Sequence, residues 1–179
     1  RVGKKILSTG NGRCNLTNYK MEEDCYRCGR KDFPMQVIRG FDVKETLDLF
    51  MGLGIVPKDR NGYVYPNSDQ AASVLDVLRT ELERLKVRIL LSCQIEKIEK
   101  KKNGGFLVHT DQGKVETDAL ILAAGSKAAP STGSDGSGYE YARQLGHSVI
   151  KPLPALVQLR CQGNLYKQMA GIRTEAEVR

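Results

Sequence analysis

Long apolar runs are missing from this 179-residue sequence, and so is an apolar signal region at its start. A membrane-spanning helix needs about 18 or more consecutive apolar residues, so we expect no segment to cross a membrane. The chain begins Arg1-Val2-Gly3-Lys4-Lys5 without an initiator methionine, and we expect such a chain to be truncated or processed. Its length suits one domain or a large part of a bigger one.

Cysteine occurs only five times, an odd number at uneven spacing, which argues against a disulfide framework. We therefore expect a reducing, cytoplasmic compartment. The CxxC pair Cys25-Tyr26-Arg27-Cys28 lacks the second pair that a structural zinc site needs, so no metal is expected. Two interpretations of the pair stay open: free thiols on a loop, or a redox pair in which the neighbouring arginine favours the thiolate.

Aromatic residues are sparse at 6%, and they form no stacking arrangement for nucleic-acid bases. The net charge of +7, from 28 Lys and Arg against 21 Asp and Glu, favours anionic cofactors or nucleic acid. The charge is scattered, however, with dense runs only at Lys4-Lys5 and Lys100-Lys101-Lys102. We expect a small-molecule substrate, and neither a nucleic-acid nor a membrane partner.

Histidine occurs only twice, and no Ser/His/Asp arrangement or catalytic carboxylate pair is visible. His109 falls in a predicted strand and His147 follows a predicted helix, so both are interpreted as structural or solvent-facing. The sequence therefore identifies no catalytic proton-transfer residue.

The segment Ser8–Asn18 is rich in polar and flexible residues: two glycines, three asparagines, two threonines and Arg13. Glycines let the backbone approach a ligand closely, and the amide and hydroxyl side chains offer donors and acceptors. The segment is interpreted as a cradle for a large polar ligand, with Arg13 beside an anionic group. A polar surface turn is the alternative, which Cys14 and Leu16 make less favoured.

Apolar spacing predicts two helices. The first begins at Asp42 as N-cap, with Glu45 completing a capping box, and ends near Gly52. The second begins at Ser68 as cap and carries a stripe of Val74, Leu75, Leu78, Leu82 and Leu85. Residues 19–40 are predicted to be irregular, and residues 57–66 to form a loop in which only 63–65 are extended.

Strands are predicted at both ends of an antiparallel meander. A short apolar strand at 87–91 precedes three strands over 94–100, 106–110 and 114–117, separated by glycine-containing turns. The apolar run Ala119–Gly125 is then predicted to be a buried strand of a parallel sheet. Its small residues Ala123, Ala124 and Gly125 leave room for a ligand at the strand's carboxyl end.

The Gly/Ser-rich loop 130–138 opens a predicted helix over 139–145. Such a loop can present amide groups and a helix dipole to an anion, or it can be a plain linker. Residues 150–159 are predicted to be extended.

Four segments together resemble the HI0933-like flavoproteins, also called BaiN-type NAD(P)/FAD-dependent oxidoreductases. They are Gly3–Asn18, Gly62–Pro66 with the helix from Ser68, Leu120–Tyr139, and Pro152–Val157. The resemblance implies an α/β fold: a partial Rossmann-like FAD/NAD(P)-binding domain over 1–150, with the three-stranded meander (about 94–117) inserted in it. Residues 151–179 would lead toward a second domain.

The resemblance implies that FAD is the cofactor, with NAD(P)H as a candidate electron donor and hydride transfer as the chemistry. The implied cofactor-binding residues are Lys4, Thr9, Gly10, Asn11, Gly12, Arg13, Cys14, Asn15, Leu16, Ile95, Ala123, Ala124 and Gly125. The family's GxGxxG phosphate loop does not occur in this sequence, so we expect weak or no FAD binding by this piece alone. Exposed sheet edges are expected to allow self-association. A non-catalytic module that uses the basic surface or the Cys25/Cys28 pair is the alternative.

Overall fold

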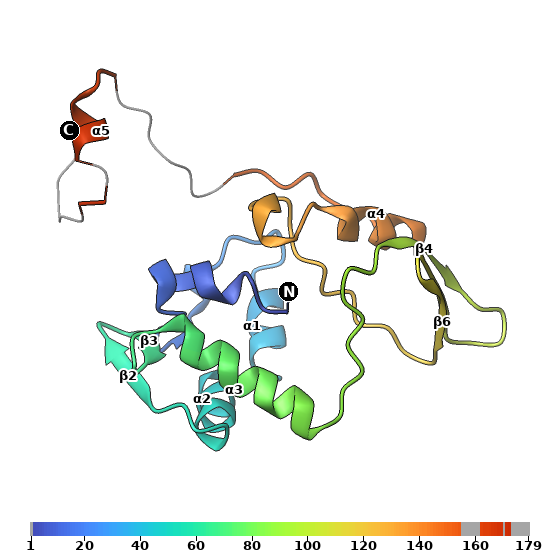
Figure 1. Cartoon of the computed structure of the whole chain (residues 1–179), viewed down its shortest axis with the longest axis horizontal. Helices are drawn as coiled ribbons and strands as arrows, with labels where there is room; N and C mark the ends of the chain where they lie inside the picture. Colours follow the sequence, from blue (N-terminus) through green and yellow to red (C-terminus); the bar gives the residue numbers. More distant parts are fainter. Residues whose placement is uncertain (1, 155–161, 170, 173–179) are drawn as a thin grey trace.

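The computed structural model describes residues 2–154, 162–169 and 171–172, and their elements form two packed groups (Figure 1). The first group runs from the 3₁₀-helix η1 (Ile6–Gly12) to helix α3 (Ala71–Arg84), which pack on each other. The second group contains a three-stranded sheet and helix α4 (Ser137–Gln144). A short helix, α5 (Leu165–Gln168), follows.

The first sheet is built around a hairpin. Its strands are β1 (Thr17–Asn18), β2 (Pro57–Arg60) and β3 (Tyr63–Pro66), in the order β1-β3-β2 with antiparallel pairing. The hairpin turn Asn61-Gly62 has φ values of 53° and 88°, as a type I′ turn requires. The prediction of a loop over 57–66 is therefore wrong outside 63–65, because this turn pairs the two halves of the segment.

Two helices cover this region, and both are close to the predicted positions. Helix α2 (Val43–Gly52) confirms the predicted capping box: Asp42 Oδ1 accepts from the Glu45 amide at 3.0 Å, and Glu45 Oε2 accepts from the Asp42 amide at 2.8 Å. Helix α3 begins at Ala71, so the predicted Ser68 cap is wrong. Asp69 has a φ of 53°, which is incompatible with a helix, and the Ser68 hydroxyl instead accepts from the Gln70 amide at 3.3 Å.

The region predicted to be irregular, 19–40, contains two short helices. They are the 3₁₀-helix η2 (Glu23–Cys25) and helix α1 (Phe33–Ile38). Pro34 suggested an interruption, but it lies in the first turn of α1, where no intrahelical amide bond is lost.

One apolar core holds the first group together. Cys14, Ile55, Ala71 and Val74 are its buried members, and Ile6 and Leu16 are among the partly buried residues around it. The predicted stripe on α3 is confirmed for Val74, Leu75 and Leu78, whereas Leu85 lies beyond the helix and is exposed. The core therefore joins the segment that follows η1 to the face of α3.

An ion-pair cluster joins the hairpin to the start of α3. Asp69 Oδ2 accepts from Lys58 Nζ at 3.1 Å and from Arg60 Nη2 at 2.5 Å. Hydrogen bonds from Arg60 and then Lys58 lower the pKa of the Asp69 carboxyl from its usual 3.8. The charged form of Asp69 is therefore favoured in the folded chain.

We expect Asp69→Asn to lower the midpoint of urea unfolding at pH 7. A carboxyl whose pKa is lower in the folded state contributes stability above its unfolded pKa, and loses it as pH falls through the folded value. The difference between variant and parent should therefore shrink between about pH 5 and pH 2. Asp76→Asn is the control, because Asp76 is exposed on α3 and makes no ion pair within the described part of the chain. A pH-independent difference for Asp69→Asn would contradict the expectation.

The second sheet confirms the predicted meander. Strands β4 (Ile95–Lys100), β5 (Phe106–Thr110) and β6 (Gly113–Thr117) pair antiparallel in the order β4-β5-β6. One face packs against α4, with Ile98, Val108 and Tyr141 buried between them. The Tyr141 hydroxyl donates to the Ile95 carbonyl at 2.5 Å, which fixes the helix to the first strand. The predicted helix over 139–145 is confirmed by α4.

The strands predicted at 87–91 and 119–125 are wrong, because neither segment has strand structure. A strand is held by hydrogen bonds to a neighbouring strand, and no segment among the described residues pairs with either of these. All strand pairs among the described residues are antiparallel, so the expected parallel sheet is not formed there. Both segments leave apolar side chains in solvent, with Ile121 91% exposed.

The end of the described chain tests little of the sequence-based prediction. Residues 150–154 lie outside helices and strands, and 155–159 of the predicted extended segment lie outside the described residues. No helix that the structure describes combines the length and apolar character needed to cross a bilayer.

Candidate functional site

The Thr9–Leu16 loop contains four residues with positive φ angles. Within η1, Gly10 and Asn11 have φ values of 53° and 55°, and Gly12 and Cys14 follow with 83° and 61°. Left-handed backbone is costly for residues other than glycine, asparagine and aspartate, so Cys14 in particular must be held in place by its surroundings. Such strain is concentrated at ligand-binding sites more often than elsewhere.

Strand β3 supplies that support. The Arg13 guanidinium lies over the Tyr65 ring, 5.1 Å from its centroid, and Arg13 Nε donates to the Gly10 carbonyl at 3.4 Å. The Val64 carbonyl accepts from the Leu16 amide at 2.8 Å and from Asn15 Nδ2 at 3.3 Å. The loop is therefore fastened by one strand that lies about fifty residues later in the sequence.

The loop has a buried side and an exposed side. Cys14 is only 9% exposed and belongs to the first core, with Leu16 packed against it. Asn11, Gly12 and Asn15 are exposed, and the backbone N–H of Asn15 donates to no backbone carbonyl among the described residues. A ligand would therefore meet Asn11, Gly12 and Asn15, while the Cys14 thiol faces the core.

Lys4 connects this region to the segment after the predicted 119–125 strand. Its ammonium donates to the Ser131 carbonyl at 2.6 Å, across 127 residues of sequence. Ser131 belongs to the 3₁₀-helix η3 (Pro130–Thr132). This contact brings two of the four resembling segments together in space.

Ala124 and Gly125 pack closely against the loop that precedes α4. A Cβ on Gly125 would lie 2.9 Å from the Ser134 Cβ, and one on Gly138 would lie 3.1 Å from the Ala124 Cβ. Ala123, Ala124 and Gly125 are themselves exposed, and the buried Ser134 hydroxyl makes no hydrogen bond with described groups. The small residues of this segment therefore permit close contact with loop 133–138 of the same chain.

The start of α4 is occupied by the chain itself. Asp135 Oδ1 accepts from the Ser137 amide at 2.9 Å, and this hydrogen bond lowers the pKa of the Asp135 carboxyl. The Asp135 carboxylate therefore takes the position at the start of α4 that an anion bound by loop 130–138 would occupy. The linker interpretation of this loop is therefore favoured.

Ile95 lies in the second group of elements. Its carbonyl accepts from Tyr141, and its side chain packs with the core between the meander and α4. The structure therefore gathers Lys4 and the Thr9–Leu16 loop around the first core, places Ala123–Gly125 beside loop 133–138, and places Ile95 with the meander.

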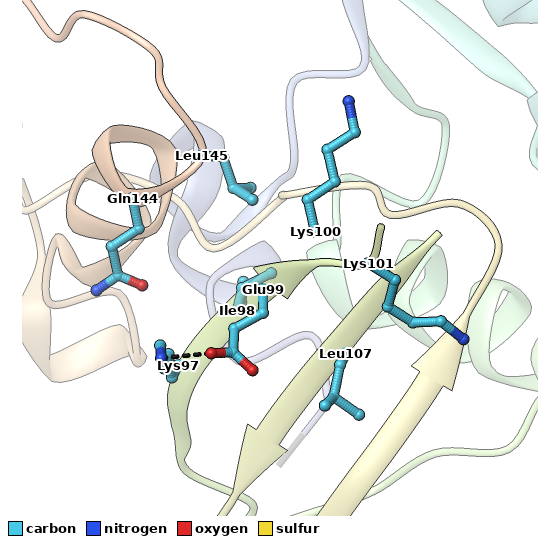
Figure 2. A pocket seen from close by; sticks show the side chains of 8 residues that line it. All are labelled: Lys97, Ile98, Glu99, Lys100, Lys101, Leu107, Gln144 and Leu145. Atoms are coloured by element: carbon cyan, nitrogen blue, oxygen red, sulfur yellow. Dashed lines mark hydrogen bonds and ion pairs between the residues drawn. The ribbon is translucent and has the colours of Figure 1, made fainter. Parts of the chain in front are cut away.

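A groove that the sequence did not predict lies between β4 and α4. It has a volume of about 570 Å³, and Lys97, Glu99 and Lys100 of β4 line it together with Gln144 of α4 and Leu145, which follows this helix (Figure 2). Lys97 pairs with Glu99, whose pKa is lowered by this contact and then by a hydrogen bond to His109. Lys101, which also lines the groove, pairs with Glu116 at 2.6 Å, whereas Lys100 makes no ion pair with described residues.

The histidines and the Cys25/Cys28 pair lie at the surface or in ion pairs. His109 is part of the Glu99 pair and His147 is exposed. Cys25 and Cys28 are exposed free thiols, whereas Cys161 lies outside the described residues. Among the residues that the structure describes, no three His, Cys, Asp or Glu side chains are placed to hold a metal ion.

Comparison with known proteins gives a family and several relatives. The profile described as the HI0933-like protein Rossmann domain matches residues 1–176. The chain is 48% identical, over 99% of its length, to a 3-dehydro-bile acid delta(4,6)-reductase of Clostridium scindens. It is 27% and 26% identical to ribosomal RNA dihydrouridine synthases of Escherichia coli and Haemophilus influenzae, over 94% and 88% of its length. The chain spans 43%, 42% and 40% of these relatives, less than half of each.

Proposed function

This chain belongs to the HI0933-like family, as its four segments predicted, and from that premise we propose that the protein is an FAD-dependent reductase. The family profile and the mixture of helices and sheets agree with the predicted Rossmann-like α/β fold class. The observation that carries the proposal is the 48% identity to a reductase over 99% of the chain. That relatedness includes the strained Thr9–Leu16 loop.

We propose that the exposed side of this loop holds part of the flavin. Its donors and acceptors fit a polar heterocycle, because the Asn11 side chain is exposed and the backbone N–H of Asn15 has no backbone partner among the described residues. When bound, the flavin would supply the hydride chemistry, and the protein would supply orientation and electrostatics. Arg13, fixed over Tyr65, keeps a permanent positive charge next to the loop.

The other residues would support or extend this site. Lys4 ties the η1 region to η3, and Thr9 closes its own turn by donating to the Ile6 carbonyl at 2.7 Å. Ala123–Gly125 and Ile95 are proposed as further contacts, as the family resemblance implies. Cys14 would contribute its backbone, since its thiol is in the core.

We propose a carbon–carbon double bond next to a carbonyl as the substrate group. The first relative is named for the delta(4,6) positions of a 3-dehydro-bile acid, and the other two for making dihydrouridine in ribosomal RNA. In each named reaction a double bond conjugated to a carbonyl is saturated. The higher identity favours a small molecule over RNA, with NAD(P)H as electron donor.

The test uses the whole protein to which this chain belongs. It should copurify with stoichiometric FAD, oxidise NADH or NADPH anaerobically, and remove the ultraviolet absorbance of a 3-oxo-4,6-diene bile acid. Ribosomal RNA treated in parallel should gain no dihydrouridine. Absence of flavin would overturn the proposal in favour of a non-catalytic module. Flavin reduction with saturation of RNA alone would instead reassign the substrate.

A further inference from the structure

The Cys25/Cys28 pair is not used by the proposed reductase function, and its surroundings suit thiol chemistry. Both residues are exposed, whereas Cys14 is buried and Cys93 is intermediate. Cys25 is the last residue of η2, and Cys28 lies in the irregular segment before α1. We propose that Cys25 and Cys28 form a thiol–disulfide site for small-molecule disulfides, in which Cys28 attacks first and Cys25 resolves.

Closing a disulfide between the two cysteines requires the backbone between them to bend. Tyr26 is extended, with φ −117° and ψ 139°, so the chain leaves η2 in an open conformation. A disulfide requires Cα atoms about 5.5–6 Å apart, so closure needs rotation within this segment. The amides of Arg27, Cys28 and Gly29 make no backbone hydrogen bond with described residues, so the rotation breaks no backbone ladder.

Hydrogen bonding distinguishes the two sulfurs. The Cys25 thiol donates to the Lys20 carbonyl at 3.9 Å, a contact that only the protonated sulfur can make. No hydrogen bond of this kind holds Cys28 among the described groups. Attack by the Cys28 sulfur therefore breaks no such contact, whereas attack by the Cys25 sulfur must first release the Lys20 carbonyl.

Charge distinguishes them in the same direction. Glu22, Glu23 and Asp24 precede Cys25, whereas Arg27 and Arg30 flank Cys28. An anionic reagent such as oxidised glutathione is attracted to the cationic side. Arg27 is also fixed in place, because its Nη1 donates to the Asp24 carbonyl at 2.6 Å and the Tyr26 carbonyl at 3.4 Å.

The exchange proceeds in two balanced steps. The Cys28 sulfur attacks one sulfur of oxidised glutathione, forming a mixed disulfide and releasing one glutathione. The Cys25 sulfur then attacks the Cys28 sulfur, forming the internal disulfide and releasing the second glutathione. Two electrons pass from the cysteines to the reagent, and the two thiol protons end on the released thiols.

The test is peptide mapping of the full chain after oxidised glutathione and alkylation of the remaining thiols. Trypsin cleaves after Arg27, so Cys25 falls in the peptide 21–27 and Cys28 in 28–30. We expect a disulfide that joins these two peptides, with Cys14 unmodified as the internal control for folding. Because this readout needs no flavin, its failure is distinguishable from failure of the proposed reductase function.

Single variants test the order of attack. Cys25→Ser should trap glutathione on Cys28, and Cys28→Ser should take up glutathione on Cys25 several times more slowly, with a smaller difference at high salt. Stable glutathione on both cysteines of the parent chain, or two unmodified thiols, would overturn the site. Equal rates in the two variants would overturn the assignment of Cys28 as the attacking thiol.

Discussion

Leu75→Ala is expected to lower the free energy of unfolding of the chain by about 2–5 kcal/mol, the range for truncating a buried leucine. Leu75 is 3% exposed and lies on α3 where this helix packs against η1. A Cβ on Gly3 would be only 2.1 Å from Leu75 Cδ1, so the leucine fills the space against the N-terminal turn. Truncation leaves a cavity that this turn cannot fill without moving.

Urea unfolding followed by circular dichroism measures this difference. Leu85→Ala is the matched control, because Leu85 caps the same helix and is 56% exposed, so its truncation should change stability by about 0.5 kcal/mol or less. Gly3→Ala adds a second test: its steric cost should be smaller in the Leu75→Ala background, where the clash is removed. Similar losses for Leu75→Ala and Leu85→Ala would contradict the packing described for η1 and α3.

The parts of the fold predicted correctly are those with local signals. The capping box of Asp42 and Glu45 and the stripe on α3 each lie within a few residues of sequence. The meander was marked by its turns, at 103–105 and 111–113. Local signals of this kind need no knowledge of distant partners.

The wrong predictions depend on partners that are distant in sequence. Segments 87–91 and 119–125 are apolar enough for strands, but apolar composition does not supply the neighbouring strand that pairing requires. The β2–β3 hairpin could have been found, since Asn61-Gly62 is a strong turn signal. Ser68 was a reasonable cap by residue type, and only the left-handed Asp69 moves the helix start.

The candidate site shows the same division. Composition pointed to the segment Ser8–Asn18, because glycine and asparagine readily adopt the positive φ values that Gly10, Asn11 and Gly12 have. Its support by Tyr65 and Val64 was not predictable, since nothing near Arg13 in the sequence indicates a ring about fifty residues later. The thiol of Cys14 likewise became a core group only through packing with α3.

Gly10→Ala is expected to disrupt this loop far more than Gly12→Ala. Both glycines have positive φ, at 53° and 83°, so alanine pays a backbone cost of about 1–2 kcal/mol at either position. Only Gly10 is crowded: its Cβ would lie 2.7 Å from the Asn15 amide nitrogen and 3.1 Å from Tyr65 Cε1. At Gly12 the nearest atom is the Leu7 carbonyl oxygen at 3.9 Å, an ordinary contact.

The additional cost at Gly10 should be about 1–3 kcal/mol, as for other overpacked sites, measured as the difference between the two variants in urea unfolding. Tyr65→Leu should not rescue Gly10→Ala, because the closer obstacle is the backbone nitrogen of Asn15.

In the whole protein, Gly10→Ala should also lower the flavin content per chain if this loop holds the cofactor. Equal unfolding costs at Gly10 and Gly12 would mean that the close approach of Gly10 to Asn15 is not maintained in solution. Rescue by Tyr65→Leu would instead identify the ring as the main obstacle.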